Sequence, residues 1–205
     1  MSVSVDSLID ADEPATKGER TRRRLLELAI ERFGTKGFRA TSVSEIARAA
    51  ELTQAAAYAY FDNKEALFRA AVDADASGLI EHVTDQVRDL PVNQLIPSVI
   101  VHAVLALEEH PLAKRILSGA EPDEIPRLID LPALSQLAGM LSEALADGQT
   151  RGEVRADLDP AVLGPGLESL IMGLLFSAVL SAGDAQPRHV LGVVEAFDLM
   201  IRPPA

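Results

Sequence analysis

Three helix starts follow one another closely between residues 42 and 67, and this stretch constrains the fold of the chain more than any other. The pair Ser42–Glu45 has the spacing of a capping box, in which each side chain accepts a hydrogen bond from the other residue's amide. Thr53 is a favourable N-cap for a second, short helix, and the pair Asp62–Glu65 repeats the capping-box spacing at a third. Two short helices joined by a brief turn predict a helix-turn-helix, whose second helix enters the major groove of DNA.

Helical periodicity also dominates the rest of the chain, and no alternation typical of strands reaches a useful length. We therefore predict an all-α fold with a three-helix head and a helical body. The first helix should end near Lys36 with Gly37 as its left-handed C-cap, and Pro165 should kink or restart a later helix. After the head, the expected helices span Asn63–Leu90, Val92–Glu109, Leu112–Leu117, Leu131–Ala146, Pro160–Ala182 and Pro187–Ile201.

The charge of the chain is distributed unevenly. The net charge is −12, which by itself argues against a nucleic-acid partner. Residues 17–72, however, carry eleven Lys and Arg against seven acids, whereas residues 73–205 carry eight against twenty. A basic head on an acidic body is typical of a DNA-binding module, although solvated helix faces explain charge asymmetry equally well.

A basic cluster opens the first helix. One interpretation is an arm that lies against DNA phosphates or enters the minor groove. The alternative is a solvated helix start. The cluster comprises Lys17, Arg20, Arg22, Arg23 and Arg24.

Composition excludes some classes of site and compartment. The chain has no cysteine, so disulfides and thiolate metal sites are excluded, and a reducing cytoplasm fits. The start of the chain is acidic and lacks the basic and apolar regions of a signal sequence. The longest apolar run, Ser169–Ala182, is shorter than a bilayer-spanning helix. We therefore expect a cytoplasmic protein without a membrane partner.

An ordered set of residues from about Thr21 to Val72 resembles the DNA-binding head of the TetR/AcrR family of bacterial transcriptional regulators. The resemblance implies a homodimer that binds a pseudo-palindromic, double-stranded operator through its heads and an unidentified small effector through its C-terminal body. We accordingly expect a disordered tail over residues 1–16, a DNA-binding domain over 17–72, and an effector-binding and dimerisation domain over 73–205. The set comprises Ala29, Phe33, Gly37, Phe38, the run Thr41–Ala47, Tyr58, Tyr60, Phe61 and the run Lys64–Leu67.

The helix-turn-helix departs from the family pattern at its turn and on its recognition helix. Glu51 stands where the family usually has glycine, and glutamate tolerates a left-handed backbone poorly. Ala55, Ala56 and Ala59 replace glycine, hydroxyl or other polar residues, so base reading falls mainly on Gln54, which suits the N7 and N6 edge of adenine. The residues expected to contact DNA are Arg39, Thr41, Ser42, Arg48, Thr53, Gln54, Ala55, Tyr58, Tyr60 and Lys64.

Three of these residues have alternative interpretations. We favour a phosphate contact for Tyr58 and core packing with an additional phosphate contact for Tyr60, while plain core packing is the alternative for both. Lys64 opposes the helix dipole at the start of its helix, so a neighbouring phosphate explains its placement better than simple solvation does. The family's backbone-contacting lysine matches this position.

The body supplies candidates for a dimer interface and for an effector site. The segment Leu167–Leu180 is apolar on almost every side, and Gly173, Ser177 and Ser181 recur every fourth residue. In the family the last two helices form a four-helix dimer interface, while an ordinary buried helix is the alternative. The acidic body favours neutral or cationic effectors, and the candidate effector residues are His82, His102, Arg115, Met140, Met172 and Phe176.

The motifs of enzymes are missing from the sequence. Its four histidines are scattered, and none has a metal-ligand spacing. No phosphate loop, nucleophile elbow or dinucleotide fingerprint occurs, so we expect no cofactor, no metal and no enzymatic activity. The main hypothesis is an effector-released repressor. The alternative is a helical ligand- or protein-binding module that binds DNA only weakly, and an enzyme on an all-α scaffold ranks third.

Overall fold

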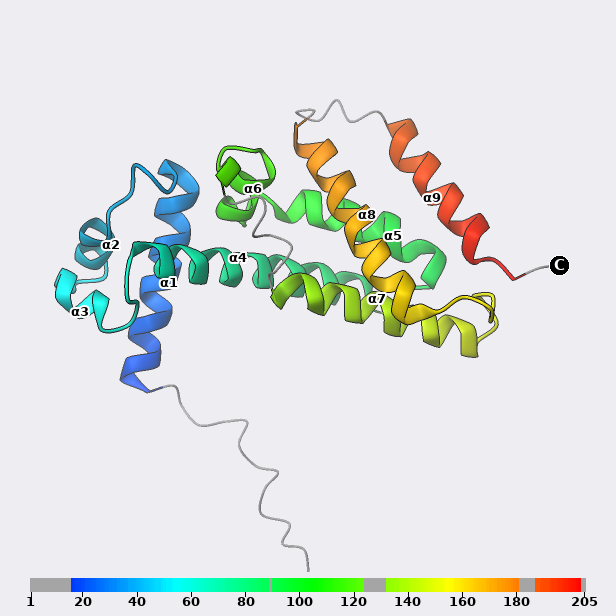
Figure 1. Ribbon diagram of the computed structural model, residues 1–205, viewed down its shortest axis with the longest axis horizontal. Coiled ribbons are helices and arrows are strands. Elements are labelled where there is room, and N and C mark those ends of the chain that lie inside the picture. Colours follow the sequence, from blue (N-terminus) through cyan, green and yellow to red (C-terminus); the bar gives the residue numbers. More distant parts are fainter. Residues whose placement is uncertain (1–15, 89, 124–131, 181–186, 204–205) are drawn as a thin grey trace, which may run out of the picture.

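The computed structural model describes residues 16–88, 90–123, 132–180 and 187–203, and all regular structure in these ranges is helical, as predicted. Figure 1 shows an elongated molecule in which α4 joins a head at one end to a body of packed helices at the other. The helices are α1 (Lys17–Lys36), α2 (Val43–Ala49), α3 (Gln54–Tyr58), α4 (Lys64–Val87), α5 (Val92–Ala106), α6 (Pro111–Leu117), α7 (Pro132–Thr150), α8 (Pro160–Leu180) and α9 (Pro187–Ile201). Residues 1–15 of the tail predicted over 1–16, the predicted helix start at Leu131, and Ser181 lie outside the described residues. Thr16, the last residue of the predicted tail, is instead the N-cap of α1.

The head is built from α1 to α3 and the first half of α4. Its core contains three residues of α2, namely Val43, Ile46 and Ala47, which are all buried. Three phenylalanine rings join the helices, because Phe68 on α4 lies edge-on to Phe33 at 5.0 Å and to Phe38 at 4.9 Å between ring centroids. This aromatic cluster fixes the angle between α1 and α4.

Two of the three predicted helix caps differ from the expected form. The Thr53 hydroxyl accepts from the amide of Ala56 at 3.2 Å, as predicted. Ser42 likewise accepts from the amide of Glu45 at 3.2 Å. The return bond of that capping box is replaced, because the Glu45 carboxylate binds Lys36 instead, and this hydrogen bond lowers the pKa of Glu45.

The third cap lies one residue later than predicted. Asn63, not Asp62, caps α4 and accepts from the amide of Ala66 at 2.7 Å. A complete capping box occurs instead at the start of α1. There Thr16 accepts from the Glu19 amide, and the Glu19 carboxylate accepts from the Thr16 amide.

Several predicted helix ends in the body shift for packing reasons. α4 and α5 end three residues earlier than expected, at Val87 and Ala106. The predicted helix end at Ala146 is wrong, because α7 continues to Thr150 and buries Gly148 against Val154. The turn falls instead at Gly152, whose φ of 74° requires the freedom of glycine.

α8 runs without a restart through Pro165, so that part of the prediction is wrong. Its neighbour Gly164 lies so close to α7 that a Cβ atom there would meet Ser142 Oγ at 2.0 Å. Among the described helices, α8 alone is long and apolar enough to cross a membrane by length and composition, over residues 160–177, so the apolar stretch is longer than predicted. Only 22% of this window is buried within the chain.

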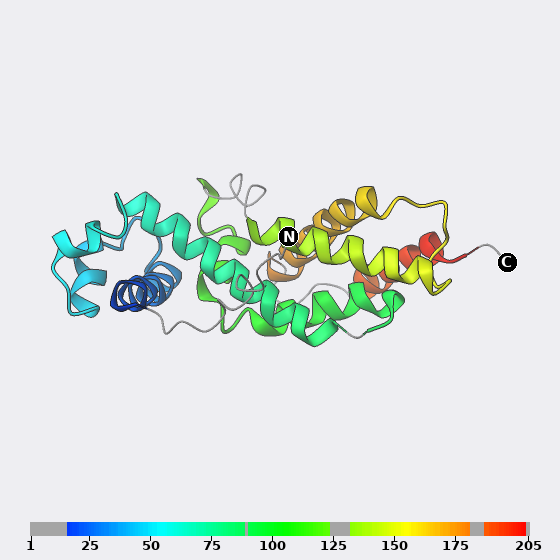
Figure 2. The ribbon, with the colours of Figure 1, turned by 90° about the horizontal axis from the view of Figure 1, so that it is seen from below.

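The short helix α6 belongs to both ends of the molecule. Its residues Leu112 and Ile116 are part of the head core, whereas Leu117 packs in the body core. Gly34 of α1 lies directly against Pro111, where a Cβ atom would stand 2.8 Å from the proline ring. In Figure 2 the long helix α4 continues from the head into the body, so α4 and α6 both connect the two.

Candidate nucleic-acid interface and internal cavity

The turn between α2 and α3 adopts the geometry that its sequence disfavours. Glu51 has a φ of 60°, and it is the only described residue other than glycine with a positive φ. The amide of Leu52 donates to the carbonyl of Ala47 at 2.8 Å and closes the turn. The backbone therefore keeps the left-handed turn, and glutamate carries the strain that glycine would avoid.

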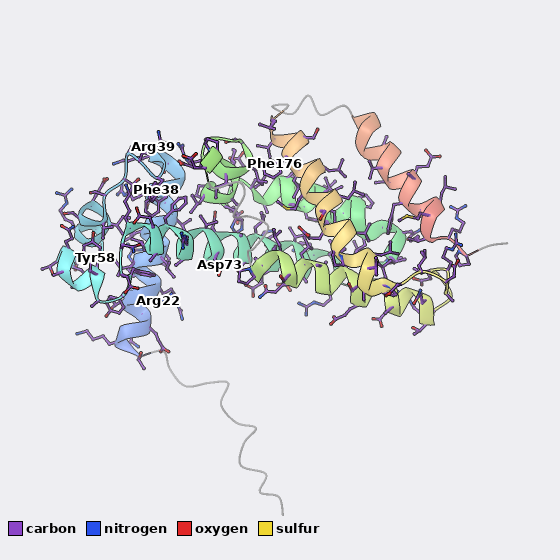
Figure 3. All side chains as sticks on the ribbon, viewed as in Figure 1. Arg22, Phe38, Arg39, Tyr58, Asp73 and Phe176 are labelled. Atoms are coloured by element: carbon purple, nitrogen blue, oxygen red, sulfur yellow. The ribbon has the colours of Figure 1, made fainter. Side chains whose placement is uncertain are left out.

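The recognition helix presents its predicted residues to solvent. Gln54 is the first residue of α3, and it is exposed together with Ala55 and Tyr58. Figure 3 shows Tyr58 at the end of the head that lies farthest from the body. Ala57 is buried and attaches α3 to the core. This helix is therefore held by one face and free on the other, as a groove-reading helix must be.

Residues around α2 extend the exposed surface. Ser42, Arg48 and Thr53 are all exposed, although the hydroxyls of Ser42 and Thr53 also serve as helix caps. Arg39 is exposed as well, and its guanidinium forms an ion pair with Asp123 of the body at 3.2 Å. Because both side chains are exposed, this pair is weak and leaves Arg39 available to another anion.

Thr41 does not belong to this surface. Its side chain is 2% exposed, and its hydroxyl bonds the carbonyl oxygens of Gly37 at 2.8 Å and Arg32 at 3.2 Å. The hydroxyl ties the loop before α2 to the end of α1. The expected DNA contact is therefore corrected to a role in positioning that loop.

Two cations flank the start of α4 and rest on aromatic rings. The ammonium of Lys64 lies 4.5 Å from the centroid of Phe38, and the guanidinium of Arg22 lies 5.0 Å from that of Phe61. The ring beneath Lys64 offsets the unfavourable helix dipole, so a phosphate is not needed to explain its placement. Lys64, as the first residue of α4, remains near the free amides of this helix start, where an anion binds favourably. Tyr60 is partly buried.

An apolar cavity of about 70 Å³ lies where α4, α5, α6, α7 and α8 meet. Of the predicted effector residues, Met172 lines it. Phe176 packs on the body core beyond it, and Met140 lines a groove outside. The other wall residues are Val72, Ala76, Leu79, Ile80, Val83, Val99, Ala103, Ala113, Ile116, Leu117, Leu134, Leu137 and Leu175.

The three polar effector candidates are not at this cavity. His82 is exposed, and His102 is partly buried outside the cavity wall. Arg115 lies on α6 facing the head, where its Nε donates to Glu121 at 2.8 Å. The structure therefore does not bring these three side chains to the described wall of this cavity, and their contact with an effector stays a prediction. Helical periodicity identifies the aliphatic wall residues as core, but it gives no signal that a space is left between them.

Elsewhere in the described chain, no group of three or more metal-ligating side chains is close enough to hold a metal ion. The ion pair between Arg115 and Glu121 lies at the boundary between the head and the body. The same Glu121 oxygen accepts from the amide of Phe38 at 3.0 Å, so the segment after α6 is tied directly to the loop after α1.

Comparisons with known proteins agree with this architecture. The family profile described as "Bacterial regulatory proteins, tetR family" matches residues 25–71. The protein named uncharacterized HTH-type transcriptional regulator YdgC, of Bacillus subtilis (strain 168), is 30% identical over 180 residues, which cover 81% of this chain and 85% of that protein. The HTH-type transcriptional repressor KstR2 of Rhodococcus jostii (strain RHA1) is 26% identical over 73% of this chain and 74% of its own.

A solved structure extends the similarity to the fold of the whole chain. The TetR-family transcriptional regulator of Cytophaga hutchinsonii superposes with a TM-score of 0.70 at 20% sequence identity. The superposition covers 93% of this chain and 98% of that one. The helical body therefore matches along with the head.

Proposed function

This chain belongs to the TetR family of bacterial transcriptional regulators, and we propose that it is a cytoplasmic repressor that a small effector releases from its operator. The observation that carries the release mechanism is the position of the internal cavity. Two residues of its wall, Val72 and Ile116, also belong to the core of the head. An effector in the cavity therefore presses on the same side chains that hold the head in place.

On the operator, the exposed surface of the head divides into two functions. Gln54 reads a base edge from the first turn of α3, where a bidentate contact to adenine suits its amide. Tyr58, Arg48, Lys64 and Arg39 contact phosphates, which fix the register of the head without reading sequence. The alanines of α3 supply only apolar contact, for example with a thymine methyl group.

A homodimer brings two heads to one operator. The outer faces of α8 and α9 carry large exposed apolar side chains, which include Leu170, Leu180, Leu191 and Leu199. Only a small part of α8 is covered within one chain, and pairing with a second copy covers the rest. The two recognition helices must then lie roughly 34–36 Å apart to enter successive major grooves.

The effector acts by changing this spacing. α4 carries Val72 in the head and Leu79 and Val83 along the cavity, so a ligand that prefers another orientation of α4 shifts the population of dimers. A coupling free energy of roughly 1–3 kcal/mol is sufficient for about a 5- to 150-fold change in operator affinity.

The test is a mobility-shift titration of the full-length protein on duplex DNA from its own promoter region, at several salt concentrations. We expect a specific, salt-dependent complex that a scrambled duplex of the same length does not form. If both duplexes bind equally and weakly, the helical binding module with poor DNA affinity is the better interpretation. The alanine-rich α3 is the observation that favours this second candidate.

A further inference from the structure

The residue types of the cavity wall indicate which kind of ligand can fill it. All fourteen wall residues that the structure describes are Val, Ala, Leu, Ile or Met, so among them no hydroxyl, amide, charged or aromatic side chain lines the cavity. An apolar cavity of this kind stays dry and takes up apolar groups instead of water. A buried charge or unpaired polar group would lose its hydration there and gain nothing in return.

We propose that the effector carries an aliphatic chain, which fills this cavity, and a polar end that bears no negative charge. The inference rests on the proposed function and deepens it, because it names the chemical class of the effector. Two observations carry it: the aliphatic wall, which selects the chain, and the charge pattern of the groove outside, which selects the polar end.

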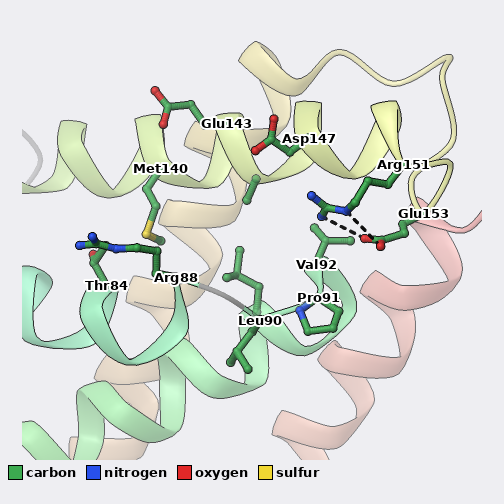
Figure 4. A pocket seen from close by; sticks show the side chains of 12 residues that line it. Thr84, Arg88, Leu90, Pro91, Val92, Met140, Glu143, Asp147, Arg151 and Glu153 are labelled. Carbon is green, nitrogen blue, oxygen red and sulfur yellow. Dashed lines mark hydrogen bonds and ion pairs between the residues drawn. The ribbon is translucent and has the colours of Figure 1, made fainter.

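A groove between α4 and α7 adjoins the cavity. Ile80 lines both the cavity and the nearer part of this groove, where Ser77, Thr84 and Gln136 offer hydrogen-bonding groups. Thr84, Arg88 and Met140 continue into its farther part, which Figure 4 shows between the end of α4, the start of α5 and α7. A ligand chain that extends from the cavity past Ile80 therefore meets polar groups in this groove.

The charges along this groove disfavour an anionic head group. Each of its two described arginines lies beside a carboxylate, since Arg88 binds Asp85 at 2.6 Å and Arg151 donates twice to Glu153 at 3.1 Å. Three more carboxylates, those of Glu81, Glu143 and Asp147, line the same groove. Carboxylates therefore outnumber arginines, and a carboxylate or phosphate on the ligand would meet like charge.

Calorimetric titration of the full-length protein without DNA tests the chain requirement. The probes are straight-chain alcohols from butanol to decanol, each below its aggregation concentration. We expect affinity to rise roughly fourfold with each added methylene until the cavity is filled, which is the increment for burying one such group. Affinity that is independent of chain length would overturn the proposal.

Head-group selectivity is tested at one chain length with octanol, octylammonium and octanoate. The alcohol and the ammonium should bind more tightly than the carboxylate at neutral pH, and the difference should shrink at high salt if it is electrostatic. Tightest binding of octanoate would overturn the assignment of the polar end.

Two variants locate the binding site. Ala103→Leu adds volume to the cavity wall and should abolish chain binding, whereas Val101→Leu on the exposed face of the same helix should leave it unchanged. Leu175→Ala enlarges the cavity and should move the optimum to longer chains, which a variant that is merely less stable would not do. An unchanged optimum in Leu175→Ala would overturn the site.

Operator release is measured separately, by adding the most tightly bound of these probes to the complex with duplex DNA from the promoter region. If the aliphatic probe binds but does not release the protein from DNA, the repressor mechanism is contradicted and the proposed ligand class stands. Release by a compound that has no aliphatic chain, with no binding by any alcohol, would contradict the ligand class and leave the repressor intact.

Discussion

The carboxylate of Asp75 on α4 lies 3.1 Å from Nδ1 of His110, the residue that precedes α6. Its other oxygen accepts hydrogen bonds from the amides of Leu112 at 3.0 Å and Ala113 at 2.8 Å. Asp75 is 4% exposed, and it caps the start of α6 from another helix. The long helix and the short one are therefore joined by a buried charge at the boundary between head and body.

Replacing Asp75 with alanine should lower the free energy of unfolding by about 1–3 kcal/mol, because two buried amides lose their acceptor. The matched control is Asp73→Ala, two residues earlier on α4. One buried oxygen of Asp73 has no hydrogen-bond partner in the described structure, so its removal should cost less. Urea unfolding of both variants makes the comparison, and equal losses would mean that the Asp75 cap contributes nothing particular.

A substitution in the strained turn should raise the free energy of unfolding instead of lowering it. Glu51 has a φ of 60°, which costs a residue with a Cβ atom roughly 1–2 kcal/mol relative to glycine. Glu51→Gly relieves this strain and loses part of the gain to unfolded-chain entropy. We expect a net increase in stability of about 0.5–1 kcal/mol in thermal or urea unfolding. A clear decrease would show that the glutamate side chain stabilises the turn in a way that outweighs its backbone strain.

The sequence predicted local features of this fold well, because their causes lie within a few residues. The Thr53 cap, the exposed Gln54 and the bounds of α9 all follow from short-range patterns. The strained position of Glu51 also followed from the glycine expected there by resemblance.

Features that depend on distant contacts were missed. Asp75 and His110 are separated by 34 intervening residues, and nothing in their spacing indicates a pair. α7 continues through Gly148 because Val154 folds back onto it, which helix-breaking composition does not predict. The cavity is a space between helices, so it depends on the angles at which they pack, and the sequence does not show that Arg115 lies away from it, paired with Glu121.

Alanine variants of Lys64 and Gln54 should have different effects, the first on DNA affinity in general and the second on sequence preference. Lys64→Ala should weaken binding to every duplex about equally and reduce the slope of log affinity against log salt by roughly 0.9, the value for one phosphate contact. Loss of its contact with Phe38 should cost only about 0.5–1 kcal/mol of stability.

Gln54→Ala should do the reverse, since a base contact carries sequence preference and little salt dependence. It should relax preference at one base pair and leave the salt slope near its original value. Fluorescence anisotropy on cognate and scrambled duplexes across a salt series measures both variants. A change of sequence preference in Lys64→Ala would reverse the roles that we assign.

The dimer proposal is tested on α8. Ser177 is exposed on the apolar face of this helix, and Ser177→Arg should bury an unpaired charge in the interface at a cost of several kcal/mol. Sedimentation equilibrium should then show monomers. The control is Ser135→Arg, an exposed serine on α7, which should remain dimeric. If Ser177→Arg sediments as an unchanged dimer, the interface lies elsewhere.

The most direct test of the central proposal is selection of bound sequences from a random pool of duplex DNA, carried out with and without the best cavity ligand. Two heads on one dimer should enrich a motif with two-fold symmetry, whose half-sites are centred about 10 base pairs or a multiple of this apart. The enrichment should fall when the ligand is present. Failure to enrich any symmetric motif, or an enrichment that a bound cavity ligand leaves unchanged, would contradict an effector-released repressor.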